Sequence, residues 1–224
     1  MESILREHAG FWNKERRKSF LWGFLFLIAA LVVQNLAGKY SAKSATNIVG
    51  DIFLDNLPTV DFTRALVDGA FLVTILGTIL FILKPRHLLF ALKVIPLLII
   101  TRSSFITLTH LGIYPNQIVL GDGMLDKLYL LLNMQDGFFF SNHTGMPFLL
   151  ALIFWYEKPW RYFFFTISAS FGIVVLFAHV HYSIDVFAAP FITYAVFKFA
   201  EIELFKRDYA TIVEHSKEGE VLKN

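Results

Sequence analysis

Cysteine is absent from this chain of 224 residues. Its absence excludes disulfides, thiolate catalysis and cysteine-ligated metal sites, and leaves the compartment undetermined. Charge is also scarce, because Asp, Glu, Lys and Arg make up 17% of the residues and the formal net charge is only +2. There is no basic stripe with interleaved aromatic residues. We therefore expect no nucleic-acid partner, and a soluble or DNA-binding role has no support.

Apolar residues are abundant instead. They make up 56% of the chain, which includes 25 phenylalanines, and the mean hydropathy is +0.57, where a soluble domain would lie near or below zero. These values predict an integral membrane protein. A polar head ends in K-E-R-R-K at Lys18 and is followed by an apolar run, 19–37, that is longer than the roughly 7–15-residue core of a secretory signal. We interpret this run as a membrane span.

The hydropathy pattern predicts an all-α fold, a bundle of six membrane-spanning helices. The predicted spans are 19–37, 65–83, 88–111, 138–156, 162–180 and 183–205. A short amphipathic piece at 125–132 is expected to lie at the membrane interface. The domain organisation that follows is a cytoplasmic head (1–18), a transmembrane catalytic domain (19–205) and a cytoplasmic tail (206–224).

The distribution of basic residues predicts the orientation. Six spans put both termini on one side, and most Lys and Arg residues fall in the head, the tail and the turns after the second and fourth spans. Cytoplasmic segments carry such an excess, so both termini are predicted to be cytoplasmic. The short loops and lean tails favour a bacterial plasma membrane. Two histidine-bearing segments, one at the start of the fourth span and one between the fifth and sixth, then lie on the same exoplasmic side.

These two segments carry the candidate chemistry. His181 and Asp185 are four residues apart, so on a helix the carboxylate can accept a hydrogen bond from one ring nitrogen. Such a bond fixes the tautomer and favours the imidazolium that forms when the other nitrogen attacks an electrophile. A phosphoryl centre suits this nucleophile, and a second histidine must then protonate the leaving oxygen and deprotonate the acceptor. His143 is the candidate for that role.

Several other residues are candidates for binding the substrate. Ser141, Asn142 and Thr144 surround His143 as small polar donors. Arg102 lies in the outer half of the third span, where an arginine is costly enough to indicate function. Thr109 is about two helical turns further along the same span. Together with Thr109, the guanidinium of Arg102 could hold a phosphate, which it can bind through two parallel hydrogen bonds.

Other interpretations remain open for these side chains. Arg102 could instead pair with Asp61 or Asp185, or extend to the membrane surface. Asp61 could be a loop carboxylate or the partner of a cationic head group. His110 could contact the head group, whereas His179 is expected to be structural. A zinc site built from both candidate catalytic histidines and Asp185 is conceivable, but we expect no metal and no cofactor.

The motifs S-N-H-T-G (141–145) and A-H-V-H-Y-S-I-D-V (178–186) resemble the signatures of the sphingomyelin synthase branch of the type 2 phosphatidic acid phosphatase superfamily. The resemblance extends to N-L-P-T-V-D (56–61) and R-S-S-F-I-T-L-T (102–109), and it covers about residues 58–197. It implies a six-span fold and an exoplasmic-facing lipid pocket without metal. It also implies His181 as nucleophile, Asp185 as its orienting group and His143 as acid and base.

Departures from the family pattern define the alternatives. Asn142 stands where the family usually has glycine, and the Lys-x6-Arg-Pro motif of the phosphatase branch is missing. The leading hypothesis is a sphingomyelin synthase-like phosphotransferase of sphingolipid metabolism, which passes a phosphoryl or phospho-head group to a lipid alcohol or to water. The first alternative is a lipid-phosphate phosphatase. The second is a non-enzymatic lipid-binding or transport protein on the same scaffold. Asn142, in place of the usual glycine, suggests this alternative.

Overall fold

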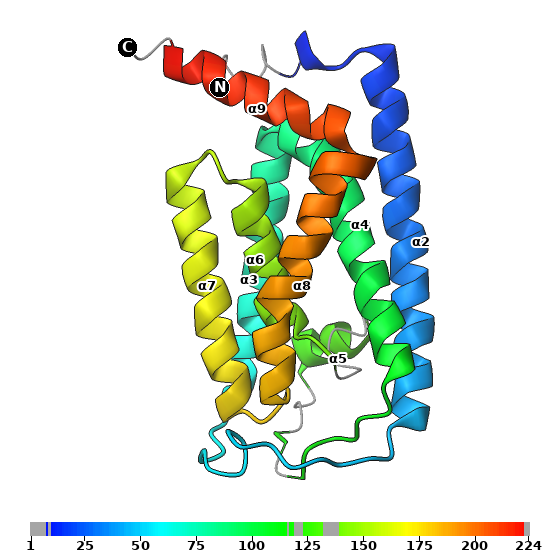
Figure 1. Cartoon of the computed structure of the whole chain (residues 1–224), viewed down its shortest axis with the longest axis vertical. Helices are drawn as coiled ribbons and strands as arrows, with labels where there is room; N and C mark the ends of the chain where they lie inside the picture. Colours follow the sequence, from blue (N-terminus) through cyan, green and yellow to red (C-terminus); the bar gives the residue numbers. More distant parts are fainter. Residues whose placement is uncertain (1–7, 9, 116, 119–122, 132–138, 222–224) are drawn as a thin grey trace.

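The computed structural model describes residues 8, 10–115, 117–118, 123–131 and 139–221. Within these ranges the chain is all-helical, without a β-strand, and Figure 1 shows the helices gathered into one bundle. The elements are α2 (Lys14–Ser44), α3 (Thr63–Leu83), α4 (Pro85–Leu108), α5 (Met124–Leu131), α6 (Asn142–Ile153), α7 (Lys158–Phe177), α8 (Ser183–Phe199), a short π-helix η1 (Ala200–Leu204) and α9 (Lys206–Val221). The all-α prediction is confirmed.

Five of the described helices are long and apolar enough to cross a membrane: α2, α3, α4, α7 and α8 with η1. The predicted fourth span corresponds to α6, which has only 12 residues and is about 18 Å long, against a hydrocarbon core of about 30 Å. The count of six spans is therefore not confirmed. The helix ends at Ile153, and the turn after it leads into α7, which has a proline in its first turn, a position that proline favours.

The other predicted spans agree with observed helices to within a few residues, except the first. Helix α2 begins at Lys14, where the side chain of Asn13 accepts a hydrogen bond from the backbone N–H of Arg16 at 2.8 Å, an N-cap that stabilises the first turn. It then continues through polar residues to Ser44 and is 31 residues long. The amphipathic piece predicted at 125–132 is α5, and the predicted tail contains α9.

Packing places α6 at the centre of the bundle. It contacts α7 and α8 closely, and nine of its residues are buried. Helix α2 instead packs along α4, where Gly23 allows the close approach, since a Cβ atom there would lie 3.0 Å from Cβ of Leu92. Large apolar side chains such as Trp22, Leu72 and Phe191 are exposed on the outside. This distribution suits a bundle surrounded by lipid.

The two ends of the bundle differ. The start of α2 and the whole of α9 lie at one end, and α5 lies toward the other (Figure 1). At the end with α9, Lys93 of α4 contacts both Asp208 and Ser19, which ties α9 to α4 and α2. At the other end, the loops before α3 and after α4 are hydrogen-bonded to the turn between α7 and α8. That turn carries His181.

Those loop contacts position the start of α8. A carboxylate oxygen of Asp51 accepts a hydrogen bond from the backbone N–H of Ser183 at 2.6 Å, and the hydroxyl of Tyr182 donates to the carbonyl of Gly112 at 3.0 Å. Burial raises the pKa of the Asp51 carboxyl, but the backbone N–H groups of Ser183 and Leu54 outweigh it and hold the pKa below its ordinary value of 3.8. The carboxylate therefore acts as a charged cap on α8.

Candidate active site

The first turn of α8 forms one half of the site. His181 precedes the helix, and its Nδ1 lies 3.1 Å from Oδ2 of Asp185, with both side chains buried. The same oxygen of Asp185 accepts the backbone N–H of Tyr182 at 3.3 Å. The carboxylate thus holds both the ring and the backbone of the turn. The contact at Nδ1 fixes the orientation of the imidazole of His181.

The start of α6 forms the other half. His143 is its second residue and is buried. The backbone N–H of Ser141 donates to the carbonyl of Asp185 at 2.9 Å, so the starts of α6 and α8 are joined directly. The ring centroids of His143 and His181 are 6.1 Å apart. The two imidazoles therefore lie at one site, as nucleophilic attack and proton transfer on a single phosphoryl group require.

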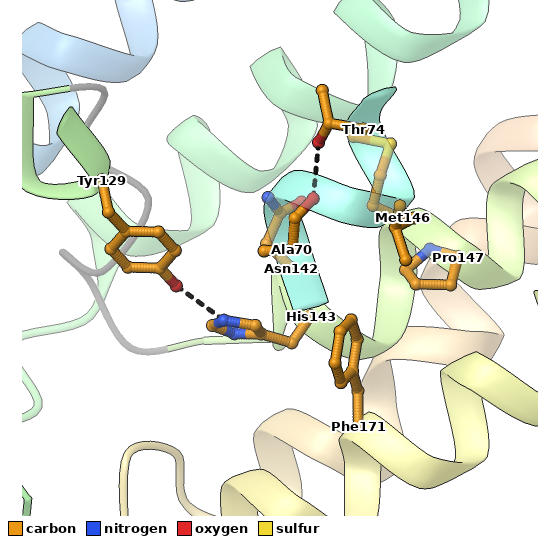
Figure 2. A pocket seen from close by; sticks show the side chains of 9 residues that line it. Ala70, Thr74, Tyr129, Asn142, His143, Met146, Pro147 and Phe171 are labelled. Carbon is orange, nitrogen blue, oxygen red and sulfur yellow. Dashed lines mark hydrogen bonds between the residues drawn. The ribbon is translucent and has the colours of Figure 1, made fainter. Parts of the chain in front are cut away.

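Tyr129 of α5 is a site residue that the sequence did not indicate. Its hydroxyl lies 2.6 Å from Nε2 of His143, and both side chains are buried. Figure 2 shows the two facing one another, with Phe171 beside the imidazole. Nδ1 of His143 has no hydrogen-bond partner within the part of the chain that the structure describes. No motif marks Tyr129, because it reaches the site from a short amphipathic helix outside the recognisable segments.

Arg102 of α4 lies near the start of α6. It is buried, and its Nε donates to the carbonyl of Phe140 at 3.3 Å. It is also close enough to His143 and Tyr129 to interact with them electrostatically. Phe139 and Phe140 have backbone φ angles of 127° and 34°, a left-handed conformation that costs free energy and collects at functional sites.

The polar residues around His143 differ in their surroundings. The hydroxyls of Ser141 and Thr144 are buried and lack hydrogen-bond partners among the described residues. Buried hydroxyls of this kind normally have a partner, so they are candidates for contacts with a bound substrate. Asn142 is partly exposed and lines two adjoining cavities. Its side chain is at the surface of the site, not within its packed wall.

Two further predicted binding residues have their described hydrogen bonds within their own segments. Asp61 is exposed, and its carboxylate accepts the backbone N–H of Thr63 at the start of α3. Thr109 lies directly after α4, and its hydroxyl donates to the carbonyl of Phe105. Both remain predictions as substrate contacts.

Two other histidines lie in the loops at this end of the bundle: His179 in the turn between α7 and α8, and His110 in the loop after α4. Nδ1 of His179 is 3.2 Å from the hydroxyl of Thr59, and its ring meets Tyr114 edge-on. His110 is exposed, and its ring lies against Tyr40. Within the described ranges, no group of three or more His, Asp or Glu side chains is arranged to hold a metal ion. His179 is thus buried among neighbouring side chains, whereas His110 is exposed.

Two cavities adjoin the site. A small one of about 30 Å³ is lined by residues that include Tyr129, His143 and Phe171. A larger one of about 330 Å³ lies between α2, α3, α4 and α6 and is lined mainly by aliphatic side chains. The two cavities share Val73, Thr74, Asn142 and Met146 as lining residues.

A comparison with protein families gives an independent view of this site. Residues 137–202 match the family model described as PAP2 superfamily C-terminal. This match supports the type 2 phosphatidic acid phosphatase superfamily. The matched segment contains His143, His181 and Asp185, whereas Arg102 and Tyr129 lie outside it. No curated protein and no solved structure matches the chain. The superfamily suggests lipid phosphatase-type activity, and the sphingomyelin synthase branch stays a prediction.

Proposed function

We propose that this protein is a membrane enzyme that cleaves a lipid phosphoester through a covalent phosphohistidine on His181. The observation that carries the proposal is the convergence of two buried imidazoles, one from the start of α6 and one from the turn before α8, with centroids 6.1 Å apart. One of them is paired with a buried carboxylate at 3.1 Å. A nucleophile with its orienting group, facing a second proton-transfer group, is the arrangement that phosphoryl transfer through an enzyme-bound intermediate needs.

In the first step, Nε2 of His181 forms a bond to phosphorus while the bond from phosphorus to the lipid oxygen breaks. The carboxylate of Asp185 accepts the hydrogen bond from Nδ1 and stabilises the positive charge that develops on the ring. His143 donates a proton to the leaving oxygen. Its Nδ1 is the nitrogen available for this, because Nε2 contacts the hydroxyl of Tyr129. Tyr129 is thus a positioning residue that determines which nitrogen carries the proton.

In the second step, His143 removes a proton from the acceptor hydroxyl, and the acceptor oxygen forms a bond to phosphorus. The bond between Nε2 of His181 and phosphorus breaks, which regenerates the free histidine. The negative charge on the phosphoryl oxygens needs nearby donors in both steps. Arg102 supplies the positive charge in this proposal, and the hydroxyls of Ser141 and Thr144 supply hydrogen bonds.

The acceptor is either water or a lipid alcohol such as a ceramide or a diacylglycerol. Water would make the protein a lipid-phosphate phosphatase, in line with the activity that the superfamily match suggests. A lipid alcohol would make it a sphingomyelin synthase-like transferase, which the resemblance of residues 58–197 favours. We propose that the site faces the exoplasmic side. Most basic residues lie in the head, the tail and the two turns at the opposite end of the bundle, and such an excess marks the cytoplasmic side.

An assay with purified protein tests the chemistry and the acceptor together. A lipid monophosphate or phosphodiester is supplied with a fluorescent lipid alcohol, and both free phosphate and fluorescent phospholipid are measured. Free phosphate alone identifies a phosphatase, and a labelled phospholipid identifies a transferase. If neither product forms from any lipid phosphoester, the proposed function is wrong.

Substitution of the histidines separates enzyme from binding protein. We expect His181→Ala and His143→Ala each to abolish nearly all turnover, because each removes a group that participates in both steps. His215→Ala is the matched control, since this histidine is exposed on α9, at the other end of the bundle, and the variant should retain wild-type turnover. A protein that only binds or transports lipid would be unaffected by all three changes.

A further inference from the structure

The larger cavity beside the site has a wall that is almost entirely apolar. Two threonines of α3 line it, but their hydroxyls donate to helix carbonyls four residues earlier, Thr74 to Ala70 and Thr78 to Thr74, each at 2.8 Å. Threonines bonded back to their own helix in this way need no other partner. Among the described lining residues, the one remaining polar side chain is Asn142.

Asn142 lies where the apolar cavity meets the catalytic pocket. It lines both cavities and directly precedes His143 in the first turn of α6, and Figure 2 shows it between Thr74 and His143. The polar amide is therefore at the boundary between the site for phosphorus and a space suited to hydrocarbon. The linkage between the phosphate and the hydrocarbon chain of a lipid has the same polarity pattern.

The size of the cavity fits one hydrocarbon chain. Its volume of about 330 Å³ is about twice that of an engineered apolar cavity that binds benzene, roughly 150 Å³. Along α3 its lining extends from Val73 to Ile82, which corresponds to about 14 Å at 1.5 Å per residue. That length is about half of the roughly 30 Å hydrocarbon core, the depth of a single leaflet.

We propose that this cavity binds one hydrocarbon chain of the substrate lipid, and that the amide of Asn142 contacts the polar linkage between that chain and the phosphate. This inference rests on the proposed function, because the chain enters from the site at His143. The residues that line the cavity would determine which chain lengths are accepted. Asn142, where the resembling family has glycine, would be a specificity-determining residue that contacts the substrate.

Gly77 allows the cavity to be shortened from within. A Cβ atom at Gly77 would lie 3.4 Å from Cδ1 of Leu150, an ordinary contact, so Gly77→Ala should be tolerated. The larger Gly77→Leu should occupy part of the cavity. Ile75→Phe is the matched control on the same helix, since Ile75 is 55% exposed and does not line the cavity.

The first test compares turnover of oleoyl and octanoyl lysophosphatidic acid by these variants. We expect Gly77→Leu to lower kcat/KM for the oleoyl substrate by about tenfold, the loss expected if about two methylene groups are expelled. The octanoyl substrate should be affected less than about twofold, and Ile75→Phe should change neither. An equal loss with both substrates would contradict the chain-binding role. Asn142→Gly should raise KM for both substrates while kcat changes little.

The second test does not depend on turnover. The His181→Ala protein is irradiated with an oleoyl lysophosphatidic acid that carries a diazirine at the end of its chain, and the labelled peptides are sequenced. Label on the cavity-lining residues Val73, Gly77 or Phe81 of α3, or on Leu27 of α2, supports the inference, and Gly77→Leu should remove it. Label on the outward residues Leu72 and Ile75 would show an annular lipid only and overturn it. The proposed function fails only if the wild-type protein turns over no lipid phosphoester, whereas the labelling pattern by itself decides the occupant of the cavity.

Discussion

Each candidate catalytic histidine has its own orienting partner. Asp185 contacts Nδ1 of His181 at 3.1 Å, and the hydroxyl of Tyr129 contacts Nε2 of His143 at 2.6 Å. In both pairs the contact at one ring nitrogen fixes the orientation of the imidazole. The two partners differ in origin. Asp185 is four residues from its histidine, whereas Tyr129 comes from a separate helix.

Tyr129→Phe tests this second partner. The change removes one hydroxyl and keeps the ring, which lies at 27° to the imidazole of His143 with the ring centroids 6.0 Å apart. We expect kcat to fall about tenfold, because a positioning hydrogen bond contributes roughly 1–3 kcal/mol and about 1.4 kcal/mol corresponds to a factor of ten. KM should stay nearly constant, and the pH dependence of kcat should shift. If thermal stability falls but the pH profile of kcat keeps its shape, Tyr129 only packs against the site.

At the scale of the element, the start of α8 depends on a residue far away in the chain. Asp51 belongs to the loop before α3, and its carboxylate accepts the N–H of Ser183 as well as those of Phe53 and Leu54. The turn with His181 is therefore held between this loop and the helix that follows. Helix α6 is held in a similar way, through the hydrogen bond from Ser141 to Asp185.

Asp51→Ala should destabilise the protein by about 1–3 kcal/mol, because it leaves buried N–H groups unpaired. The pH dependence follows from the lowered pKa of Asp51. Since the folded protein binds this proton less tightly than the unfolded chain, the carboxylate stabilises the fold above the ordinary value of 3.8, and this contribution is lost as the pH falls through the folded-state pKa. Thermal unfolding in detergent should show a gap between wild type and variant that is constant from pH 5 to 7.

That gap should close only below about pH 4, once the carboxylate of the wild-type protein is protonated. A difference that disappears already near neutral pH would mean that another group, not Asp51, is responsible for it.

For the whole molecule, the absence of cysteine makes the orientation directly testable. Single cysteines can be placed at Ile52, in the loop at the end with the site, and at Glu214, on α9. Ile52 is 77% exposed, and Glu214 is exposed as well. With both termini in the cytoplasm, a membrane-impermeant maleimide should label Ile52→Cys in intact cells and Glu214→Cys only after permeabilisation. The reverse pattern would place the site on the cytoplasmic side.

Much of the fold could be predicted from local sequence. Apolar runs predicted five of the long helices, because a helix that crosses lipid must satisfy its own backbone hydrogen bonds within one continuous segment. The predicted fourth span was less accurate. Its composition is apolar beyond the helix, but the residues after Ile153 form a turn, and hydropathy does not distinguish a buried turn from a buried helix.

The candidate site, too, could be predicted only in part from local sequence. Sequence alone determined that this is a membrane protein with histidines near two helix starts, and that His181 and Asp185 are spaced to meet, because these are properties of neighbouring residues. Only the tertiary structure decided that His143 lies 6.1 Å from His181, that Tyr129 contacts it, and that an apolar cavity begins at Asn142. Each of these depends on how separate helices pack against one another, and residues far apart in a chain carry no local pattern for the surfaces they will share.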